Sequence, residues 1–472
     1  MSQPEQTTKT ATIVVACVAT AMLMLDISVI NTALSEIAGG LDTGLSGLQW
    51  VVDAYTIPLA ATVLTAGAMA DRFGRRRYFL AGLAVFTATS AVCGAAPTIE
   101  TLVAARAIQG LGASLMFATA LALISQVTPR REDRLKALAA YGAAIGASFA
   151  LGPFVGGGLT ELFGWRAIFL VNVPIGIVVF WLTYRRVGEG RDPRPRRIDI
   201  PGQVTLISGL FLLVLALLRG NEDGWGSTRI VVALAGAAAL LVGFIVVEGR
   251  AREPMLPLRL MRRREFAGAQ VAVFAIAASF FAVFLYLTLY LQTVLGLSPI
   301  QTGLVYLPGT FLVFVVSGMT AQLGASYSAA KIASVGLALV AAGLALLLFC
   351  QVGSSWLVLM PGLLVTSIGT GLFNPTGSEL ALRALPAEQS GLAAGSNDTF
   401  RQTGVAVGIA ALGTLVPAAS ALAGGDLQAY VDGLHHALIA SAALAGVGAL
   451  ATAWLLIPVP TPAGSEIATE AA

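Results

Sequence analysis

Charged residues are scarce in this sequence. Asp, Glu, Lys and Arg make up 11% of its 472 residues, 57% are hydrophobic, and the mean hydropathy is +0.83. A soluble domain usually carries about 25% charged residues. The composition therefore excludes a soluble globular protein and indicates a chain that crosses a lipid bilayer many times.

Lysine is also rare, with three residues against 25 arginines. None of the three follows a glycine, so the chain lacks a GK[ST] phosphate-binding loop and we do not expect ATP-driven pumping. The three cysteines lie in apolar segments, which predicts free thiols and no disulfide framework. The sequence shows neither a metal-ligand cluster nor a nucleophile–base pair, so we expect no metal site and no enzyme.

Apolar runs long enough to cross the ~30 Å hydrocarbon core recur along the whole chain. The predicted fold class is an all-α integral membrane protein with fourteen transmembrane helices. These are expected at residues 11–34, 48–70, 78–96, 99–125, 135–160, 165–185, 200–219, 229–248, 266–292, 300–323, 331–351, 355–380, 394–418 and 434–457.

Two polar stretches rich in Arg and Pro, Arg186–Ile200 and Gly249–Glu265, separate one helix pair from two blocks of six. The predicted order is thus 6+2+6. The domains are a six-helix bundle (1–185), a linker with two additional helices (186–264), a second six-helix bundle (265–458) and a cytoplasmic tail (459–472). Tyr55 and Gly67 match Tyr306 and Gly318 at one offset of 251 residues, which favours two related halves with a substrate cavity between them.

The basic residues predict the orientation. Of the 28 Lys and Arg, 23 fall in loops on the side of the N-terminus. The positive-inside rule then puts both termini in the cytoplasm of a multi-pass protein of the inner (cytoplasmic) membrane.

One carboxylate, Asp26, lies just past the middle of the apolar run Ala11–Leu34. A carboxylate there costs ~2.5–3.5 kcal/mol on insertion scales, so it is usually neutral, paired or facing a wet cavity. We interpret Asp26 as the group that takes up and releases a proton. Asp53 and Arg106 are expected at a similar depth and could form an electrostatic network with it. The alternative is that backbone carbonyls hold Arg106 for packing.

Two glycine-containing motifs suggest moving parts. In GAMADRFGRRR, one glycine would permit close helix approach, the next a tight turn, and the aspartate an ion pair or a helix cap. In YGAAIGASFALGPFVGGGL, a Gly-rich bend could open and close against the other half. The alternatives are an ordinary positive-inside anchor and plain glycine packing. The predicted gating residues are Gly67, Asp71, Arg72, Gly74, Arg75, Arg76, Gly152, Pro153, Gly156 and Gly157.

These motifs resemble those of a known family. GAMADRFGRRR resembles the G-xxx-D-R-x-G-R-R signature of major facilitator superfamily transporters, LVAARAIQGLG resembles their R-xx-QG-x-G element, and GPFVGG resembles the antiporter motif of their exporters. LDISVINTAL, WVVDAY, GWRAIFLVNVPIG and PLRLMRRREF, together with fourteen spans, are similar to the fourteen-helix drug:proton antiporter family. The second-half counterpart of the first motif, GMTAQLGAS, has Gln322 in place of Asp71.

The resemblance implies a major facilitator superfamily fold and export of lipophilic, often cationic drugs or secondary metabolites against inward proton flow. It assigns proton coupling to Asp26 and Asp53, in reach of Arg106. The expected partners are a lipophilic small molecule, protons and the lipid bilayer, with no nucleic acid. The expected state is a monomer with no cofactor, driven by the proton gradient. The candidate substrate-binding residues are Asp26, Asp53, Tyr55, Tyr286, Tyr290 and Asn374.

Three further expectations complete the interpretation. Asn374–Pro375 should mark a local helix break that faces the cavity, and Asp398 should pair with Arg401 or a neighbour. The alternative function is a transporter of the same fold for a specific metabolite or lipid, as in a flippase. A sensor or scaffold is disfavoured because no loop exceeds about 20 residues.

Overall fold

The protein is described by a computed structural model that covers residues 3–128, 130–191, 199–251, 253–324, 326–385, 390–417 and 425–456. Throughout these ranges the regular structure is helical. The predicted tail, 459–472, lies outside the described residues.

The first half of the chain forms long helices that begin and end within about four residues of the expected spans, except the first, which begins at residue 3 and ends at residue 41 instead of covering the expected span 11–34. They are α1 (Gln3–Leu41), α2 (Leu45–Phe73), α3 (Arg75–Ala95), α4 (Ile99–Val127), α5 (Arg131–Phe163), the short α6 (Ala167–Leu170) and α7 (Asn172–Arg186). Two further helices follow, α8 (Ile200–Asp223) and α9 (Thr228–Arg250).

The second half begins with a short 3₁₀ turn, η1 (Leu258–Arg262). One long span follows, in which α10 (Arg264–Ile276) and α11 (Ala282–Leu289) alternate with the π-helical turns η2 (Ala277–Phe281) and η3 (Tyr290–Val294). The remaining elements are α12 (Pro299–Leu323), α13 (Ala329–Leu346), η4 (Leu347–Phe349), η5 (Trp356–Leu359), α14 (Met360–Arg383), α15 (Ser390–Gly413) and α16 (Leu427–Leu456).

Thirteen helical segments of the described ranges are long and apolar enough to cross a membrane. The remaining long helix, α15, corresponds to the expected span 394–418 and contains the polar sequence SNDTFRQ at 396–402, which lowers its hydropathy. The predicted all-α membrane fold is therefore confirmed, with thirteen apolar spans and α15 as the fourteenth.

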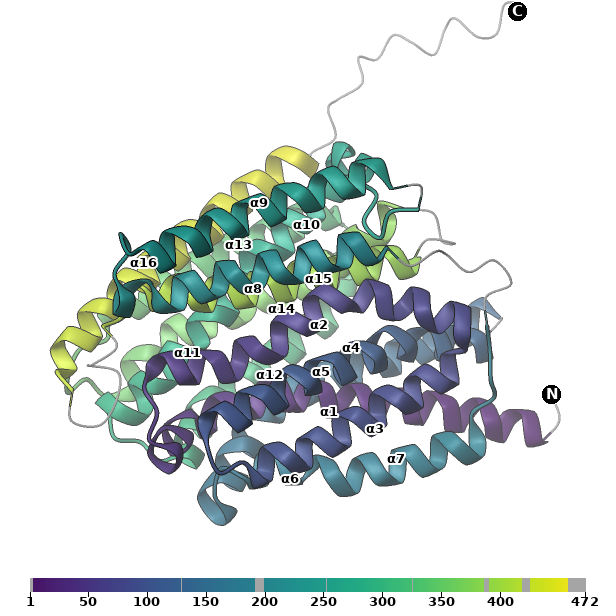
Figure 1. Cartoon of the computed structure of the whole chain (residues 1–472), viewed down its shortest axis with the longest axis horizontal. Helices are drawn as coiled ribbons and strands as arrows, with labels where there is room; N and C mark the ends of the chain where they lie inside the picture. The colour runs from purple at the N-terminus through teal and green to yellow at the C-terminus, as the bar shows by residue number, and fades with distance from the viewer. Residues whose placement is uncertain are drawn as a thin grey trace, which may run out of the picture.

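The helices pack as two groups joined along two seams. In the first half α1 packs on α5, and α4 packs on α2 and α3; in the second half α13 packs on α14 and α16. The seams between the halves are α5 against α12 and α2 against α15. Helix α8 lies over α2 and α15 beside the second seam, with α9 packed on it (Figure 1).

Helix direction defines the two ends of the molecule. We call the end where α1 begins and α16 ends the terminal end, and the opposite end, where α5 ends and α12 begins, the distal end. Because most long helices run from one end to the other, a residue's position along its helix gives its depth between these ends.

Prolines lie inside four long helices, at Pro58, Pro153, Pro308 and Pro375. The predicted break at Asn374–Pro375 is wrong, because α14 continues through it. A proline frees the carbonyl four residues earlier, and hydroxyls of neighbouring helices can satisfy it in a membrane. Ser317 of α12 donates to the Gly371 carbonyl at 3.1 Å, which is the carbonyl that Pro375 frees.

The same arrangement recurs in the first half. Pro153 frees the Phe149 carbonyl of α5, and Ser28 of α1 donates its hydroxyl to that carbonyl at 3.3 Å. At each of these two prolines, a serine on an adjacent helix donates a hydrogen bond to the carbonyl that the proline frees, so the helix can continue through it.

Candidate functional site

Asp26 and Arg106 form a buried ion pair between α1 and α4. Arg106 Nη1 lies 2.5 Å from Asp26 Oδ2, and each side chain is 1% exposed. Arg106 also donates from Nε to the Val51 carbonyl of α2 at 3.2 Å, and its guanidinium lies 4.2 Å from the ring centre of Tyr55. A carboxylate, a backbone carbonyl and an aromatic face thus hold the guanidinium together.

The second oxygen of Asp26 is held by two amide side chains. Asn172 of α7 donates to Asp26 Oδ1 at 3.1 Å, and Gln109 of α4 donates to it at 3.3 Å. Both amides also donate to Ser90 Oγ of α3, at 3.1 and 3.2 Å. Gln109 Oε1 accepts from Arg106 at 2.9 Å. Side chains of α4 and α7 therefore hold the carboxylate of α1 directly, Ser90 of α3 supports both amides, and the carboxylate is buried within the first half.

Sequence reasoning placed Asp26 and Arg106 at one depth but did not identify Gln109, Asn172 and Ser90 as their partners. The available signal was that each is a polar residue in an apolar span, where such side chains are costly and need partners. Two of them lie within motifs already noted, LVAARAIQGLG and GWRAIFLVNVPIG.

Asp53 lies outside this network. Val51 and Tyr55 face Arg106, and Asp53 is two residues from each, so it projects from the other side of α2. Its carboxylate is fully buried, and neither oxygen has a hydrogen-bond partner. The expected three-residue network is therefore wrong in including Asp53.

Asp53 instead lies on the face of α2 that meets the second half. Gln49, one turn earlier, donates to Tyr286 Oη of α11 at 2.7 Å, and Thr399 of α15 donates to the Ala60 carbonyl of α2 at 2.9 Å. An unpaired carboxylate is thus buried in the seam between the halves.

The other predicted substrate-binding residues are dispersed. The Tyr286 hydroxyl donates to the Ile409 carbonyl of α15, whereas Tyr290 donates to the Gln351 carbonyl at 2.8 Å, within the second half. Tyr55 is fully buried and its hydroxyl has no partner. Asn374 is half-buried, and its carbonyl accepts from Ser378 at 3.1 Å. Only Tyr55 lies against the Asp26–Arg106 pair.

A second acid, Asp398 of α15, is buried in the same region. It is 6% exposed and its Oδ2 has no hydrogen-bond partner. No ion pair within 4.0 Å joins it to Arg401, and the side chain that hydrogen-bonds to it is that of the neighbouring Gln402, so of the two expected partners, Arg401 or a neighbour, it is the neighbour. Its neighbour Thr399 donates to the Ala60 carbonyl of α2 at 2.9 Å, so this part of α15 lies against the first half. A third buried carboxylate therefore approaches the first half from the opposite side of the seam.

The glycines of GPFVGG allow α5 to touch two helices at once. A Cβ on Gly156 would lie 2.8 Å from the Val29 carbonyl of α1, and one on Gly157 would lie 2.3 Å from the Pro299 carbonyl of α12. Gly152 likewise faces Ser28 of α1, and the Pro153 carbonyl faces Gly303 of α12. The motif therefore forms the α5–α12 seam towards the distal end.

Hydrogen bonds close this end of the molecule. Glu161, at the end of α5, accepts from Ser298 Oγ at 2.6 Å and from the Ile300 backbone N–H at 3.1 Å, at the N-terminus of α12. Gln292 donates to the Thr32 carbonyl of α1 at 2.8 Å. The carboxylate of Glu161 thus complements the positive end of the α12 helix dipole.

The charged turn between α2 and α3 lies at the terminal end. Arg75 donates from Nε to Asp71 Oδ1 at 2.8 Å, one helical turn away. Gly74 joins the helices with φ 125°, a conformation that favours glycine. A Cβ on Gly67 would lie 3.9 Å from Ala118, an ordinary contact, so the expected close helix approach at Gly67 is wrong.

The segment that follows α7 docks on this turn. Glu189 Oε1 accepts from the Arg76 backbone N–H at 3.0 Å, and the Arg76 guanidinium lies 5.4 Å from the ring centre of Tyr184. Arg72 lies over the ring of Phe73 at 5.5 Å. The chain that leads to α8 and α9 is thus attached to the start of α3.

The fold, with a charged pair buried between its helices, defines a class, the polytopic membrane proteins of two packed helical bundles. Among solved structures, a POT family transporter in complex with a thioalcohol-conjugated peptide superposes with a TM-score of 0.68 at 14% identity, covering 93% of this chain and 94% of that one. The human organic anion transporter MFSD10 (TETRAN) gives 0.60 at 16% identity, covering 96% and 100%. At these identities the likeness shows the fold.

The family model of the Major Facilitator Superfamily matches residues 16–409, and the chain belongs to this family of transporters. Among its relatives, Multidrug resistance protein Stp of Mycobacterium tuberculosis is 37% identical over 84% of this chain and 74% of its own length. Methylenomycin A resistance protein of Streptomyces coelicolor is 33% identical over 84% of both chains. Puromycin resistance protein pur8 of Streptomyces alboniger is 34% identical over 96% of this chain and 92% of its own. The predicted family is confirmed, and the chain is a transporter, not an enzyme.

Proposed function

We propose that this transporter is a proton-coupled antiporter that exports lipophilic, often cationic drugs or secondary metabolites by alternating access. The observation that carries the proposal is the Asp26–Arg106 pair, buried between the helices of a chain whose relatives are named as resistance and export proteins.

Asp26 is the proposed coupling group. As a carboxylate it neutralises Arg106 and accepts from Asn172 and Gln109. When a proton from the distal side binds Asp26, the Arg106 charge loses its counter-ion in a low-dielectric interior, which favours a rearrangement of the bundle. Release of that proton at the terminal side restores the ion pair and completes the cycle.

Substrate is proposed to bind between the halves. Asp53 and Asp398 place two buried carboxylates without an ion-pair partner within 4.0 Å among the described residues on opposite sides of the seam, and a cationic substrate would neutralise them. Because a proton would also neutralise them, drug and proton compete, and by linkage drug binding lowers the affinity of the site for protons. Tyr55, Tyr286, Tyr290 and Asn374 remain the proposed aromatic and polar contacts.

Two gates would control access. At the distal end the Gly152–Gly157 segment and Glu161 would separate from α12, whereas at the terminal end the turn with Asp71, Arg75 and Arg76 would move with the docked Glu189. The entry of a proton down a ~100 mV potential releases ~2.3 kcal/mol of free energy, and the exit of a monovalent cation against that potential costs the same amount. One-for-one exchange would therefore be driven by the pH gradient alone.

The remaining assignments are part of the same proposal. The terminal end carries the basic loops and would face the cytoplasm of the inner membrane. The chain would act as a monomer of a 6+2+6 plan with domains 1–185, 186–264 and 265–458, a tail at 459–472, and no cofactor. The packing of α8 on both α2 and α15 supports α8–α9 as an addition beside the seam.

The test is substrate-induced proton release from purified protein, together with dye efflux by inverted vesicles with and without a pH gradient. We expect a cationic lipophilic dye to release protons from the wild type and not from Asp26→Asn. Asp42→Asn is the matched control, since Asp42 is exposed and its φ of 49° suits Asn equally well. Uphill efflux by Asp26→Asn at the wild-type rate would refute the coupling role, and efflux that ignores the pH gradient would favour a flippase-like transporter.

A further inference from the structure

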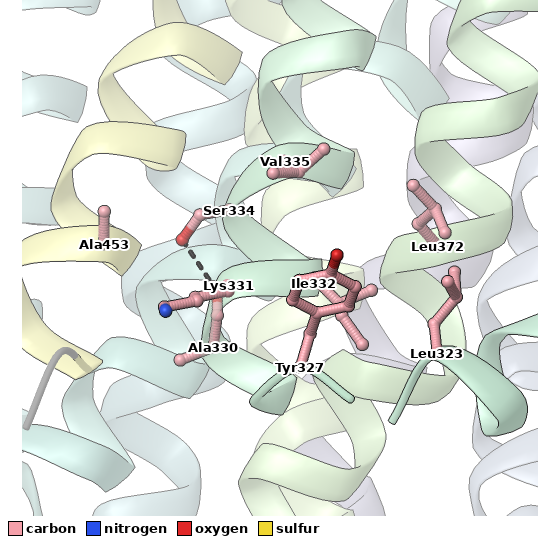
Figure 2. A pocket seen from close by; sticks show the side chains of 9 residues that line it. All are labelled: Leu323, Tyr327, Ala330, Lys331, Ile332, Ser334, Val335, Leu372 and Ala453. Atoms are coloured by element: carbon pink, nitrogen blue, oxygen red, sulfur yellow. Dashed lines mark hydrogen bonds between the residues drawn. The ribbon is translucent and has the colours of Figure 1, made fainter. Parts of the chain in front are cut away.

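One cavity lies away from the central site. It has a volume of about 470 Å³ and opens on the surface of the second half between α12, α13, α14 and α16 (Figure 2). Lys331, in the first turn of α13, and Ala453, in the last turn of α16, place it at the terminal end. Its volume is within the ~300–1,000 Å³ of small-molecule pockets.

The walls of this cavity are apolar. Leu323, Leu372 and Val335 line it, and Tyr327 covers one side (Figure 2). The one hydroxyl of the α13 wall, on Ser334, donates to the Ala330 carbonyl at 2.8 Å and so is already satisfied. Apart from the Tyr327 hydroxyl and the Lys331 amine, the described lining offers no free polar group that could hold ordered water, which makes hydrocarbon the natural content of the cavity.

Lys331 is the one cation among the described residues that line the cavity. Arg264 lies close by, 5.1 Å from the ring centre of Trp454. The alkyl stem of Lys331 lines the cavity, and its amine lies on the side nearer Ala453 (Figure 2). No carboxylate of the described residues lies within 4.0 Å of this amine. Trp454, next to Ala453 and 66% exposed, is typical of the membrane–water interface, which places the lysine at headgroup level.

We propose that this pocket binds an anionic phospholipid of the adjacent leaflet, with an acyl chain in the cavity and the phosphate on Lys331. The chemistry of the ligand follows from the combination of an apolar cavity with a cation at its mouth that no carboxylate of the described residues approaches within 4.0 Å. A cationic drug, the substrate class of the proposed function, would meet the charge of Lys331 unfavourably. This inference depends on the chain lying in a membrane, and it does not depend on the proposed proton coupling.

The position of the pocket suggests what the lipid would do. It lies beside the turn between α12 and α13, the second-half counterpart of the turn that Asp71 and Arg75 hold by an ion pair. Gln322 stands where that aspartate would be, so this turn lacks the acid. A bound lipid would join α13 to α16 at this point.

Native mass spectrometry of the full chain in detergent tests the proposal, with titration of phosphatidylglycerol and of phosphatidylcholine of the same acyl chains. We expect tighter binding of phosphatidylglycerol. Lys331→Gln should weaken it about fivefold, the equivalent of ~1 kcal/mol for one lysine near a membrane surface, and should leave phosphatidylcholine unchanged. Lys331→Arg should restore the preference.

Two further variants make the result specific. Val335→Trp fills the cavity and should weaken both lipids, whereas Lys136→Gln, on α5 of the other half and also exposed, should weaken neither. The proposal would be overturned if wild type bound the two lipids equally, or if Lys331→Gln and Lys136→Gln bound phosphatidylglycerol with the same affinity. Displacement of phosphatidylglycerol from wild type by a cationic dye would also overturn it. Transport is not measured, so failure here leaves the proposed antiport untouched.

Discussion

Neutralising one member of the Asp26–Arg106 pair should be far more damaging than neutralising both. Arg106 is 1% exposed, so Asp26→Asn leaves a guanidinium buried without its counter-ion. Breaking a buried ion pair from one side costs about 3–5 kcal/mol, whereas replacing both charges with neutral groups is often nearly neutral. We therefore expect the double variant Asp26→Asn/Arg106→Gln to recover about 2 kcal/mol or more relative to the sum of the single variants.

The assay is a double-mutant cycle on the free energy of unfolding in detergent, followed by denaturant titration and tryptophan fluorescence. Glu379 and Arg383 provide the matched control, because they form an ion pair at the same 2.5 Å distance but are 40% and 71% exposed. An exposed pair one helical turn apart is worth about 0.3–0.5 kcal/mol. Burial is thus the main difference between the two cycles.

The reasoning fails if the coupling energy of Asp26 with Arg106 is no larger than that of Glu379 with Arg383. That result would mean that water reaches the pair, or that Gln109, Asn172 and the Tyr55 ring stabilise Arg106 without the carboxylate. The cycle measures stability, so it is independent of whether Asp26 carries the transported proton.

Three further predictions concern the two ends of the molecule. Glu161→Gln removes a charge from the N-terminus of α12. The state open at the distal end should therefore be stabilised by about 0.3–1 kcal/mol relative to the closed state, which spin-label distances across the α5–α12 seam would measure. Gly74→Ala should lower the free energy of unfolding by about 1–3 kcal/mol because of its φ of 125°, whereas Gly67→Ala should change it by less than about 0.5 kcal/mol. The hydrogen bond from Lys9 lowers the pKa of Asp133, so the Tm advantage of wild type over Asp133→Asn should persist above the ordinary carboxyl pKa of about 3.9 and disappear as the pH falls through the lowered pKa.

Each has a result that would contradict it. Unchanged spin-label distances in Glu161→Gln would show that the carboxylate adds nothing to distal closure. Equal unfolding free energies for the two alanine variants would mean that Gly74 is not constrained by its backbone. A Tm difference for Asp133→Asn that grows towards acid would reverse the sign of the linkage.

The sequence by itself determined the membrane class, the positions of the spans and the depth of the key charges. A helix rises by a fixed length per residue, so Asp26, Asp53 and Arg106 could be assigned a common level from their positions alone. Interactions along one helix or turn were also accessible: Asp71 pairs with Arg75 one turn away, and the turn at Gly74 needs a positive φ.

The direction in which each side chain points around its helix axis was decided by tertiary structure. Asp53 shares the level of Arg106, yet packing turns it towards α15, whereas Asn172, 146 residues away in sequence from Asp26, donates to it. The continuity of α14 through Pro375 likewise depends on a hydroxyl from α12. Hydropathy and spacing record how deep a residue lies, but which neighbour it faces follows from how the helices fit against one another. That fit defines both the Asp26–Arg106 ion pair and the buried carboxylates of the seam.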